Sequence, residues 1–381
     1  MTDVENALSV AERAALRRSI ATTNDPYVSA IPKIELHIHI EGIISADLKW
    51  KFSQRNAQPI TNPRTNQPFS SLEELRDSHD TLKPRAGNRM DNSEETLSFF
   101  EAYYGGFEAL KTTRDYYDLA MEYYERAAGM NVRYAEIFFD PQGHTRVGTS
   151  WETMMEGFRA AQGKAERELD VKSAWIMCFL RDESLESATQ HYNAALKYRD
   201  MIIGIGLDSN EVGRPPSLFD GVFARARNDG FRLTAHCDVG KHYPLDHIHQ
   251  VALGIAGIGA DRIDHGLNAA GDASLTTLIK SKELGMTICP WSYIRHQPLD
   301  EVFGRIRALF DAGIMISIGS DDPAFMEDTW VLENLLVVKK YCGFTNVEVQ
   351  KLAENAINMC WASGGAKERM MRELYDVDPG P

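Results

Sequence analysis

Apolar residues recur along this chain with two spacings, one typical of strands and one typical of helices, and the two follow one another in a regular order. Short runs rich in β-branched and aromatic residues predict eight strands, and a segment with helical spacing follows each strand from the second onward. A repeated strand-then-helix order indicates a parallel sheet, and eight strands favour a closed (β/α)8 barrel, the TIM barrel, over an open doubly wound sheet. The strands are expected to begin near Lys33, Val132, Val171, Met201, Phe231, Asp261, Met286 and Ile314.

The segment between the fourth and fifth strands illustrates how the helices are predicted. Pro215 and Pro216 suit the start of a helix, and Gly230 suits its end. We therefore expect a helix whose apolar face packs on the sheet. Its apolar residues recur at helical spacing: Leu218, Phe219, Val222, Phe223 and Ala226.

Two regions depart from this repeat. Residues 51–97, after the first strand, form a polar segment rich in Pro, Asn and Arg. An insertion after a barrel strand emerges at the C-terminal mouth, where such barrels carry their active sites, so we expect either a lid or a disordered loop. Residues 330–381 have helical spacing and are expected to form extra C-terminal helices outside the barrel. The whole chain, residues 1–381, is then a single barrel domain.

The first predicted strand, KIELHIHIEG, carries two histidines on one face. His37 and His39 point toward the barrel axis, because the apolar residues share the opposite face, which packs against the helices. Two imidazoles at this spacing can reach a single metal ion. The alternative is a pair of core histidines satisfied by hydrogen bonds. The apolar face comprises Ile34, Leu36, Ile38 and Ile40.

Two more residues of types that bind metals lie where other predicted strands end. His236 ends the fifth strand, FRLTAHCD, and Asp321 follows the eighth, IMISIGSDDP. With His37 and His39 they make four nitrogen and oxygen donors at one mouth, which indicates a catalytic Zn²⁺ site with room for water. Asp321 is also a candidate to orient or deprotonate that water. Asp321 and Asp322 before a proline also suit a helix N-terminus, which does not exclude ligation.

Three more polar residues follow predicted strands and are candidate site residues. His265, in RIDHG after the sixth strand, is positioned to bind or deprotonate an attacking water, or simply to cap the strand end. Asp238 shares the strand face of His236 under period-two geometry, which points its carboxyl into the mouth. Ser209, in GIGLDSNEVG, replaces the third glycine of a dinucleotide fingerprint, so this segment is expected to shape a pocket rim instead.

The net charge and the cysteine content limit the classes of binding partner and the cellular setting that we expect. A formal charge of −14 opposes binding to nucleic acid and to anionic membranes, and it favours a small neutral ligand. The longest apolar stretch is about half of the roughly 20 residues that span a bilayer. Five cysteines without a CxxC pair, and an N-terminus without a signal sequence, favour a reduced, cytoplasmic setting. The oligomeric state stays open, with a homo-oligomer among the options.

Several of these motifs together resemble the adenosine/adenine deaminases of the amidohydrolase superfamily. The similarity runs from PKIELHIHIEG to SIGSDDPAF and includes EIFFDPQGHTRVG, GIGLDSNEVGRPPSLF, RIDHG and CPWS, so it covers most of the barrel. The runs EIFFDPQ and LDSNEVG are more similar to the adenine branch. The resemblance implies a zinc ion held by His37, His39, His236 and Asp321.

The resemblance also implies a reaction and a substrate. Zinc-activated water, assisted by His265, attacks the amino-bearing carbon of a purine-type ring, and ammonia leaves. Asp322 is expected to contact the imidazole side of the purine, and Ser209 to line its pocket. The position of Glu41 is an aspartate in members that hold a ribose and a glutamate in the adenine branch, which favours a free base.

One departure from the family pattern bears on the substrate. Family members read HAGE after the fifth strand, and that glutamate protonates a ring nitrogen, whereas here the run is HCDVG with Val239 at the glutamate position. Either Asp238 or Glu211 supplies the acid, or the substrate needs no such proton. The competing functions are a zinc hydrolase of an N6-substituted purine or another cyclic amine or amide, and a catalytically inactive purine-binding homologue.

Overall fold

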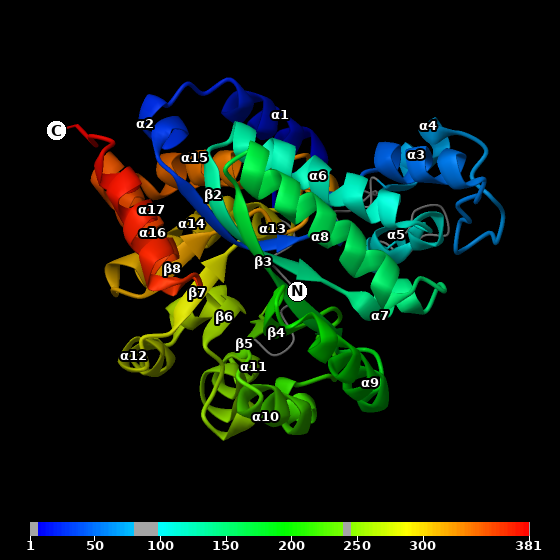
Figure 1. Cartoon of the computed structure of the whole chain (residues 1–381). Coiled ribbons are helices and arrows are strands. Elements are labelled where there is room, and N and C mark those ends of the chain that lie inside the picture. Colours follow the sequence, from blue (N-terminus) through cyan, green and yellow to red (C-terminus); the bar gives the residue numbers. More distant parts are fainter. Residues whose placement is uncertain (1–6, 80–97, 239–244, 381) are drawn as a thin grey trace.

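A single parallel sheet forms the centre of the molecule. The computed structural model describes residues 7–79, 98–238 and 245–380, and its eight strands are each hydrogen-bonded to the next strand in sequence. Figure 1 shows the strands in the middle with helices around them, so the predicted (β/α)8 barrel is confirmed. The strands are β1 (Lys33–His39), β2 (Val132–Phe139), β3 (Lys172–Leu180), β4 (Ile202–Asp208), β5 (Arg232–Cys237), β6 (Arg262–His265), β7 (Gly285–Ile288) and β8 (Met315–Ile318).

The barrel closes where the end of β8 meets β1. The backbone N–H of His39 donates to the carbonyl of Asp321 over 3.1 Å, and the N–H of Asp321 donates to the carbonyl of His37 over 3.0 Å. Gly319 permits this approach, because a Cβ there would lie 2.7 Å from the carbonyl oxygen of His37. Closure therefore places Asp321 beside both histidines of β1.

The helices cover the outside of the sheet with their apolar faces. In α14, for example, Val302, Phe303, Ile306 and Leu309 are buried, at the spacing of one helical face. The described helices between β1 and β8 are α3 (Ala46–Asn56), α4 (Leu72–His79), α5 (Phe99–Tyr104), α6 (Thr113–Gly129), α7 (Pro141–Thr145), α8 (Trp151–Glu168), α9 (Leu185–Ala195), α10 (Asp220–Asn228), α11 (Asp246–His249), α12 (Ala273–Ser281), α13 (Pro290–Ile294) and α14 (Leu299–Asp311).

The helix predicted between β4 and β5 differs in its first turn. A 3₁₀ segment, η5 (Pro216–Phe219), precedes α10, and its tighter winding rotates the side chains away from helical spacing. Phe219, Phe223 and Ala226 are buried as expected, whereas Leu218 is exposed. The predicted apolar face is thus correct after Phe219 and wrong at Leu218.

The segments outside the repeat are largely helical where they are described. Helices α3 and α4 occupy part of residues 51–97, and residues 80–97 of the predicted lid lie outside the described residues. Helices α1 (Val10–Ala21) and α2 (Pro26–Ala30) precede β1. The C-terminal part forms α15 (Val331–Cys342), α16 (Asn346–Met359) and α17 (Gly364–Tyr375), and Figure 1 shows α16 and α17 outside the strands. Among the described residues, no helix is long and apolar enough to cross a membrane.

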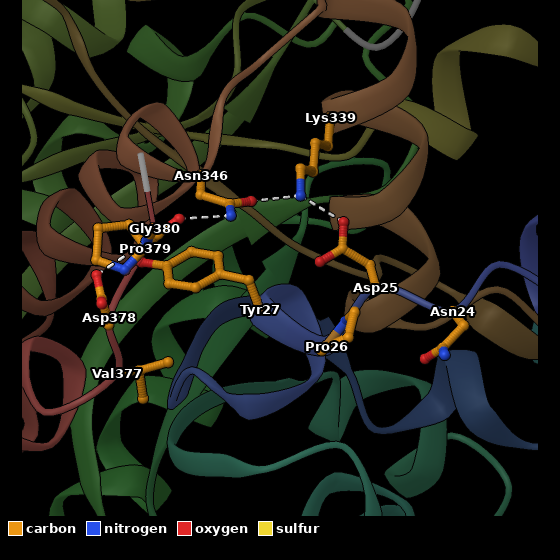
Figure 2. Close-up of a pocket in the computed structure, with 10 residues that line it drawn as sticks. All are labelled: Asn24, Asp25, Pro26, Tyr27, Lys339, Asn346, Val377, Asp378, Pro379 and Gly380. Carbon is orange, nitrogen blue, oxygen red and sulfur yellow. Dashed lines mark hydrogen bonds and ion pairs between the residues drawn. The ribbon is translucent and has the colours of Figure 1, made fainter.

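A cavity of about 580 Å³ lies next to α2, which leads into the first residue of β1. Its position at the N-terminal end of the barrel strands separates it from the catalytic mouth. Figure 2 shows that Lys339, the cation in its wall, contacts the carboxylate of Asp25 and the side-chain oxygen of Asn346. Because this charge is already matched, we place the chemistry of the protein at the opposite end.

Candidate metal centre

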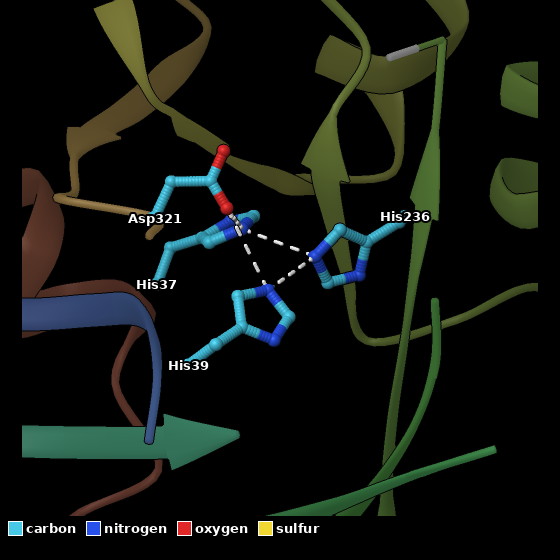
Figure 3. A group of neighbouring side chains, drawn as sticks. All are labelled: His37, His39, His236 and Asp321. Atoms are coloured by element: carbon cyan, nitrogen blue, oxygen red, sulfur yellow. Dashed lines mark hydrogen bonds and ion pairs between the residues drawn. The ribbon is translucent and has the colours of Figure 1, made fainter. Parts of the chain in front are cut away.

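Four predicted ligands meet at the mouth of the barrel. His37 and His39 come from β1, His236 from β5, and Asp321 follows β8; one ligand atom from each lies within 4.8 Å of all the others. The Nε2 atom of His236 lies 2.9 Å from Nε2 of His39 and 3.1 Å from Nε2 of His37. Figure 3 shows the three rings and the carboxylate converging on one point. All four side chains are buried.

The second ring nitrogens fix the tautomers that present these Nε2 atoms. The Nδ1–H of His236 donates to the carbonyl of Leu207 over 3.2 Å. Thr287 donates its hydroxyl proton to Asp264, so its oxygen accepts the Nδ1–H of His37 over 2.7 Å. Both rings therefore direct the Nε2 lone pair toward the convergence point, as metal-binding histidines do.

The electrostatics of this cluster match a cation. Burial lowers the pKa of His39 to about 3 and that of His236 well below its ordinary value, so both rings are neutral at pH 7. Burial by itself raises the pKa of Asp321, but the hydrogen bond with His37 and the nearby histidines outweigh burial and hold this pKa low. Converging lone pairs and a carboxylate repel one another unless a positive ion lies between them, so this donor set fits zinc.

His265 stands beside the four ligands. Its Nε2 lies 3.8 Å from the second oxygen of Asp321, and its Nδ1 lies 2.9 Å from the hydroxyl of Tyr293. Burial lowers the pKa of His265 to about 4, which keeps the ring neutral at pH 7. The side chain is therefore placed to accept a proton from a group bound at the metal centre.

Comparison with known proteins agrees with this geometry. The model of the family described as adenosine deaminase matches residues 32–377. The chain belongs to the adenosine deaminase family. It is 37% identical over 356 residues to an adenine deaminase of Rhodospirillum rubrum, covering 93% of this chain and 99% of that protein. The strands and the His/His/His/Asp cluster thus belong to a deaminase-family barrel.

Solved structures give the same fold. A crystal structure of adenine deaminase from Arthrobacter aurescens is 32% identical, with a TM-score of 0.79 and coverage of 91% of this chain and 99% of that one. An amidohydrolase from Burkholderia ambifaria, solved with bound Zn, is 23% identical, with a TM-score of 0.75 and coverage of 99% and 98%. The likeness to the second protein supports the fold alone.

In this deaminase-family chain, several strand ends share an unusual backbone. Ser209, Asp238, His265 and Asp321 have φ angles of 68°, 68°, 63° and 63°, in the left-handed region that non-glycine residues rarely adopt. Such residues cost about 1–3 kcal/mol each and cluster at functional sites. The left-handed turns re-aim these side chains, an effect that no strand periodicity in the sequence reveals.

The turn at Asp238 changes the geometry that period-two spacing predicts. Strand β5 ends at Cys237, so the expectation that Asp238 continues the face of His236 is wrong. One carboxylate oxygen of Asp238 accepts the backbone N–H of Asn268 over 2.7 Å, and the other accepts the Asn268 side-chain amide. Burial raises the pKa of Asp238 to about 8. Val239 lies outside the described residues.

Glu211, the other candidate acid, lies close to Asp238. One carboxylate oxygen of Glu211 accepts the backbone N–H of Asp238 over 3.1 Å and lies 2.8 Å from Nδ1 of His247. The same oxygen lies 3.6 Å from Arg181. The two candidate acids therefore occupy one corner of the mouth, after β4 and β5.

Glu41 and Asp322 lie buried at the same mouth, and Ser209 is partly buried there. Oε1 of Glu41 accepts the backbone N–H of Asp140 over 2.9 Å and lies 3.0 Å from Nε2 of His144. Oε2 of Glu41, Oγ of Ser209 and Oδ1 of Asp322 are buried without a hydrogen-bond partner. These three atoms are candidate contacts for a ligand, although the Tyr104 hydroxyl also faces Ser209.

The sequence reasoning missed Asp140 and Asp208. Asp140 directly follows β2, Asp208 ends β4, and each places a carboxylate oxygen near a ring nitrogen of His39. The sequence feature that could have identified them is a single acidic residue at the end of an apolar strand, in EIFFDP and in GIGLD. Burial, followed by the repulsion between these neighbouring carboxyls, raises the pKa of Asp208 well above its ordinary value.

Proposed function

We propose that this protein is a zinc-dependent hydrolase that deaminates a free aminopurine base and releases ammonia. The observation that carries the proposal is the convergence of three imidazoles and one carboxylate beside His265. Membership of the adenosine deaminase family supplies the reaction class. The donor set supports zinc, because zinc takes nitrogen and oxygen ligands in sites that leave one position for water.

A zinc ion at this centre lowers the pKa of its bound water to about 7 and so supplies a nucleophile at neutral pH. The residues of the chain orient and deprotonate that water. Asp321 presents one oxygen to His37 and the other to His265, so this carboxylate links the ligand cluster to the proton acceptor. The Tyr293 hydroxyl fixes the His265 ring from the other side. Protons leave the nucleophile along this side of the mouth.

A carboxylic acid is needed to protonate the ring nitrogen beside the attacked carbon, and we assign this role to Asp238. Its raised pKa, about 8, keeps the carboxyl protonated at neutral pH. Both carboxylate oxygens of Asp238 also accept hydrogen bonds from Asn268, so Glu211 is the next candidate for the acid. General acid help of this kind contributes about 10² to 10⁴-fold in rate.

The substrate preference rests on buried polar atoms around the metal centre. Glu41, Ser209 and Asp322 each offer an unpartnered oxygen, which suits a small ring with N–H groups. Glu41 at a position where ribose-holding members have aspartate favours the free base over the nucleoside. No nucleic acid or membrane partner is expected from a chain with a formal charge of −14.

Val239 at the usual glutamate position favours a second candidate function. The same zinc ligands serve a hydrolase that removes a larger amine from an N6-substituted purine, whose leaving group makes different demands on proton transfer. The product separates the two functions, because this hydrolase releases an alkylamine. An inactive homologue instead shows stabilisation by purines without turnover.

The test is ammonia release by the zinc-loaded protein across a panel of aminopurine bases, their ribosides, N6-methyladenine and aminopterins. The proposal expects ammonia from at least one free base, with a higher kcat/KM than for its riboside. A higher kcat/KM for adenosine than for every base contradicts the branch assignment. Absence of ammonia from the whole panel contradicts the deaminase proposal itself.

A further inference from the structure

Two buried aspartates border the metal centre beside His39. Asp140 and Asp208, here called the acidic pair, are 1% and 4% exposed. They come from the ends of β2 and β4, and their ligand atoms lie within 4.8 Å of each other and of a nitrogen of His39. Two carboxyls at this separation under burial repel each other strongly unless donors lie between them.

The two carboxyls of the acidic pair interact with each other, and among the described residues their remaining oxygens lack a strong donor. Both oxygens of Asp208 and Oδ1 of Asp140 are buried without a hydrogen-bond partner. Among the described residues, no lysine or arginine forms an ion pair with either carboxyl. The Cys178 thiol faces Asp208 from β3, but a thiol is a weak donor. Buried acceptors of this kind normally have partners, so the pair points to a ligand.

The second oxygen of Asp140 is held in place. It accepts the hydroxyl proton of Tyr104 over 3.2 Å, while the backbone N–H of Asp140 donates to Glu41. Tyr104 ends α5, in the segment between β1 and β2. The free oxygen of Asp140 therefore has a fixed direction, as expected for a recognition group.

His39 argues against a second metal ion at this pair. Its Nε2 faces His236 and Asp321 in the metal centre, and its Nδ1 lies 3.6 Å from Asp208. To bind ions on both sides, the ring would have to lose its remaining proton. With Nε2 committed to the metal centre, Nδ1 keeps its proton and becomes a further donor toward Asp208. Organic N–H donors therefore suit the remaining oxygens better than a cation does.

We propose that the acidic pair is a specificity element that binds the ring N–H of the substrate on the edge away from the reacting carbon. The identity of the ring as a purine rests on the proposed function. An unsubstituted base offers that N–H, whereas a substituent on the imidazole nitrogen removes it. A phosphorylated substrate is rejected, because among the described residues no lysine or arginine pairs with the two carboxyls or is placed there to pair with a buried phosphate.

Binding of product-like probes tests this without turnover. Hypoxanthine and 9-methylhypoxanthine differ only at the ring N–H and have no amino group to lose, and inosine 5′-monophosphate carries a ribose and a phosphate at that nitrogen. In the zinc-loaded wild type we expect calorimetry to give a Kd about 10- to 100-fold lower for hypoxanthine than for its 9-methyl form, the range for leaving a buried acceptor without its hydrogen bond. We expect no binding of the monophosphate.

The selectivity ratio is the Kd of 9-methylhypoxanthine divided by the Kd of hypoxanthine. Asp208→Asn and Asp140→Asn should each bring this ratio toward one while zinc content stays unchanged. Asp261→Asn is the matched control, because Asp261 precedes β6 at the other end of the barrel and accepts hydrogen bonds from Arg232 and Leu233 there. Its ratio should equal that of the wild type. If an asparagine variant fails to fold, the wild-type ratio across the three probes still decides.

A ratio near one in the wild type, an unchanged ratio in both folded variants, or no binding of hypoxanthine overturns the proposal. Ammonia release with an unchanged ratio overturns the acidic-pair proposal and leaves the deaminase proposal standing. A ratio that depends on Asp208, without ammonia release from any substrate, overturns the deaminase proposal and leaves the acidic-pair proposal standing. The two proposals can therefore fail separately.

Discussion

The two halves of the barrel mouth differ in how their polar groups are satisfied. On the side of β1, β5 and β8, three ring nitrogens and a carboxylate converge on one point, and further hydrogen bonds orient the rings. On the side of β2 and β4, two buried carboxyls keep oxygens that lack partners. One half is built to hold a positive ion, and the other offers acceptors to something that carries donors.

This difference assigns separate tasks to the two halves. Convergent lone pairs are explained by one shared cation, and burial keeps His39 and His236 neutral and so able to bind it. Divergent acceptors, of which Asp140 is held by Tyr104, are explained by a ligand that carries N–H groups. His39 belongs to both halves, since one nitrogen faces each.

The largest effect is expected at His265, which borders the metal half. His265→Ala should lower kcat by about 10² to 10⁴-fold, the range for general acid–base catalysis, because it removes the acceptor beside Asp321. Zinc content should stay near that of the wild type, because the four ligands remain. Steady-state kinetics on the best substrate and elemental analysis check both points. Loss of zinc in this variant would instead make His265 a ligand.

A smaller effect is expected at the candidate acids, which lie between the two halves. Asp238→Asn keeps the side-chain shape and removes the acid, so kcat should fall by about 10²-fold with zinc still bound. Glu211→Gln provides the matched comparison. Near-normal turnover in Asp238→Asn, together with a large loss in Glu211→Gln, would move the proton donor to Glu211.

The smallest effect concerns stability on the side of the acidic pair. Lys49 of α3 is buried and donates to the carbonyls of Ala102, Tyr103 and Gly105, which ties α3 to the helix that carries Tyr104. Burial lowers the pKa of Lys49 to about 7. Between pH 7 and 10.5 the folded chain therefore binds fewer protons at this residue than the unfolded chain, so the free energy of unfolding rises with pH.

Lys49→Met should remove this contribution. Urea titrations at pH 7.5 and pH 9.5 should show the stability of the wild type gaining at least about 1 kcal/mol relative to the variant at the higher pH. Other titrating groups cancel in the comparison of the two proteins. A difference that is independent of pH would show that Lys49 is protonated throughout this range.

The fold and the metal half were predictable from the sequence for the same reason. Strand periodicity of two places His37 and His39 on one face, and parallel strands bring His236 and Asp321 to the same mouth. Every observed strand begins within one residue of its expected start. These properties depend on local pattern and topology, which a single sequence contains.

The other half was not predictable, because it depends on turns and on mutual placement. The left-handed backbone at Asp238 directs its carboxyl to Asn268, contrary to the strand periodicity. Asp140 and Asp208 are ordinary single acids in the sequence, and only the fold brings them together at His39. A 3₁₀ turn in the same way exposes Leu218. The direction of a side chain beyond the end of a strand depends on the three-dimensional structure of the turn that follows.

The separation of the two halves is tested most directly by zinc analysis of three proteins in parallel. We expect about one zinc per chain in the wild type, none in the His37→Ala, Asp321→Ala double variant, and about one in the Asp140→Asn, Asp208→Asn double variant. Full zinc content without His37 and Asp321, or loss of zinc without the two carboxylates of the acidic pair, would contradict this separation.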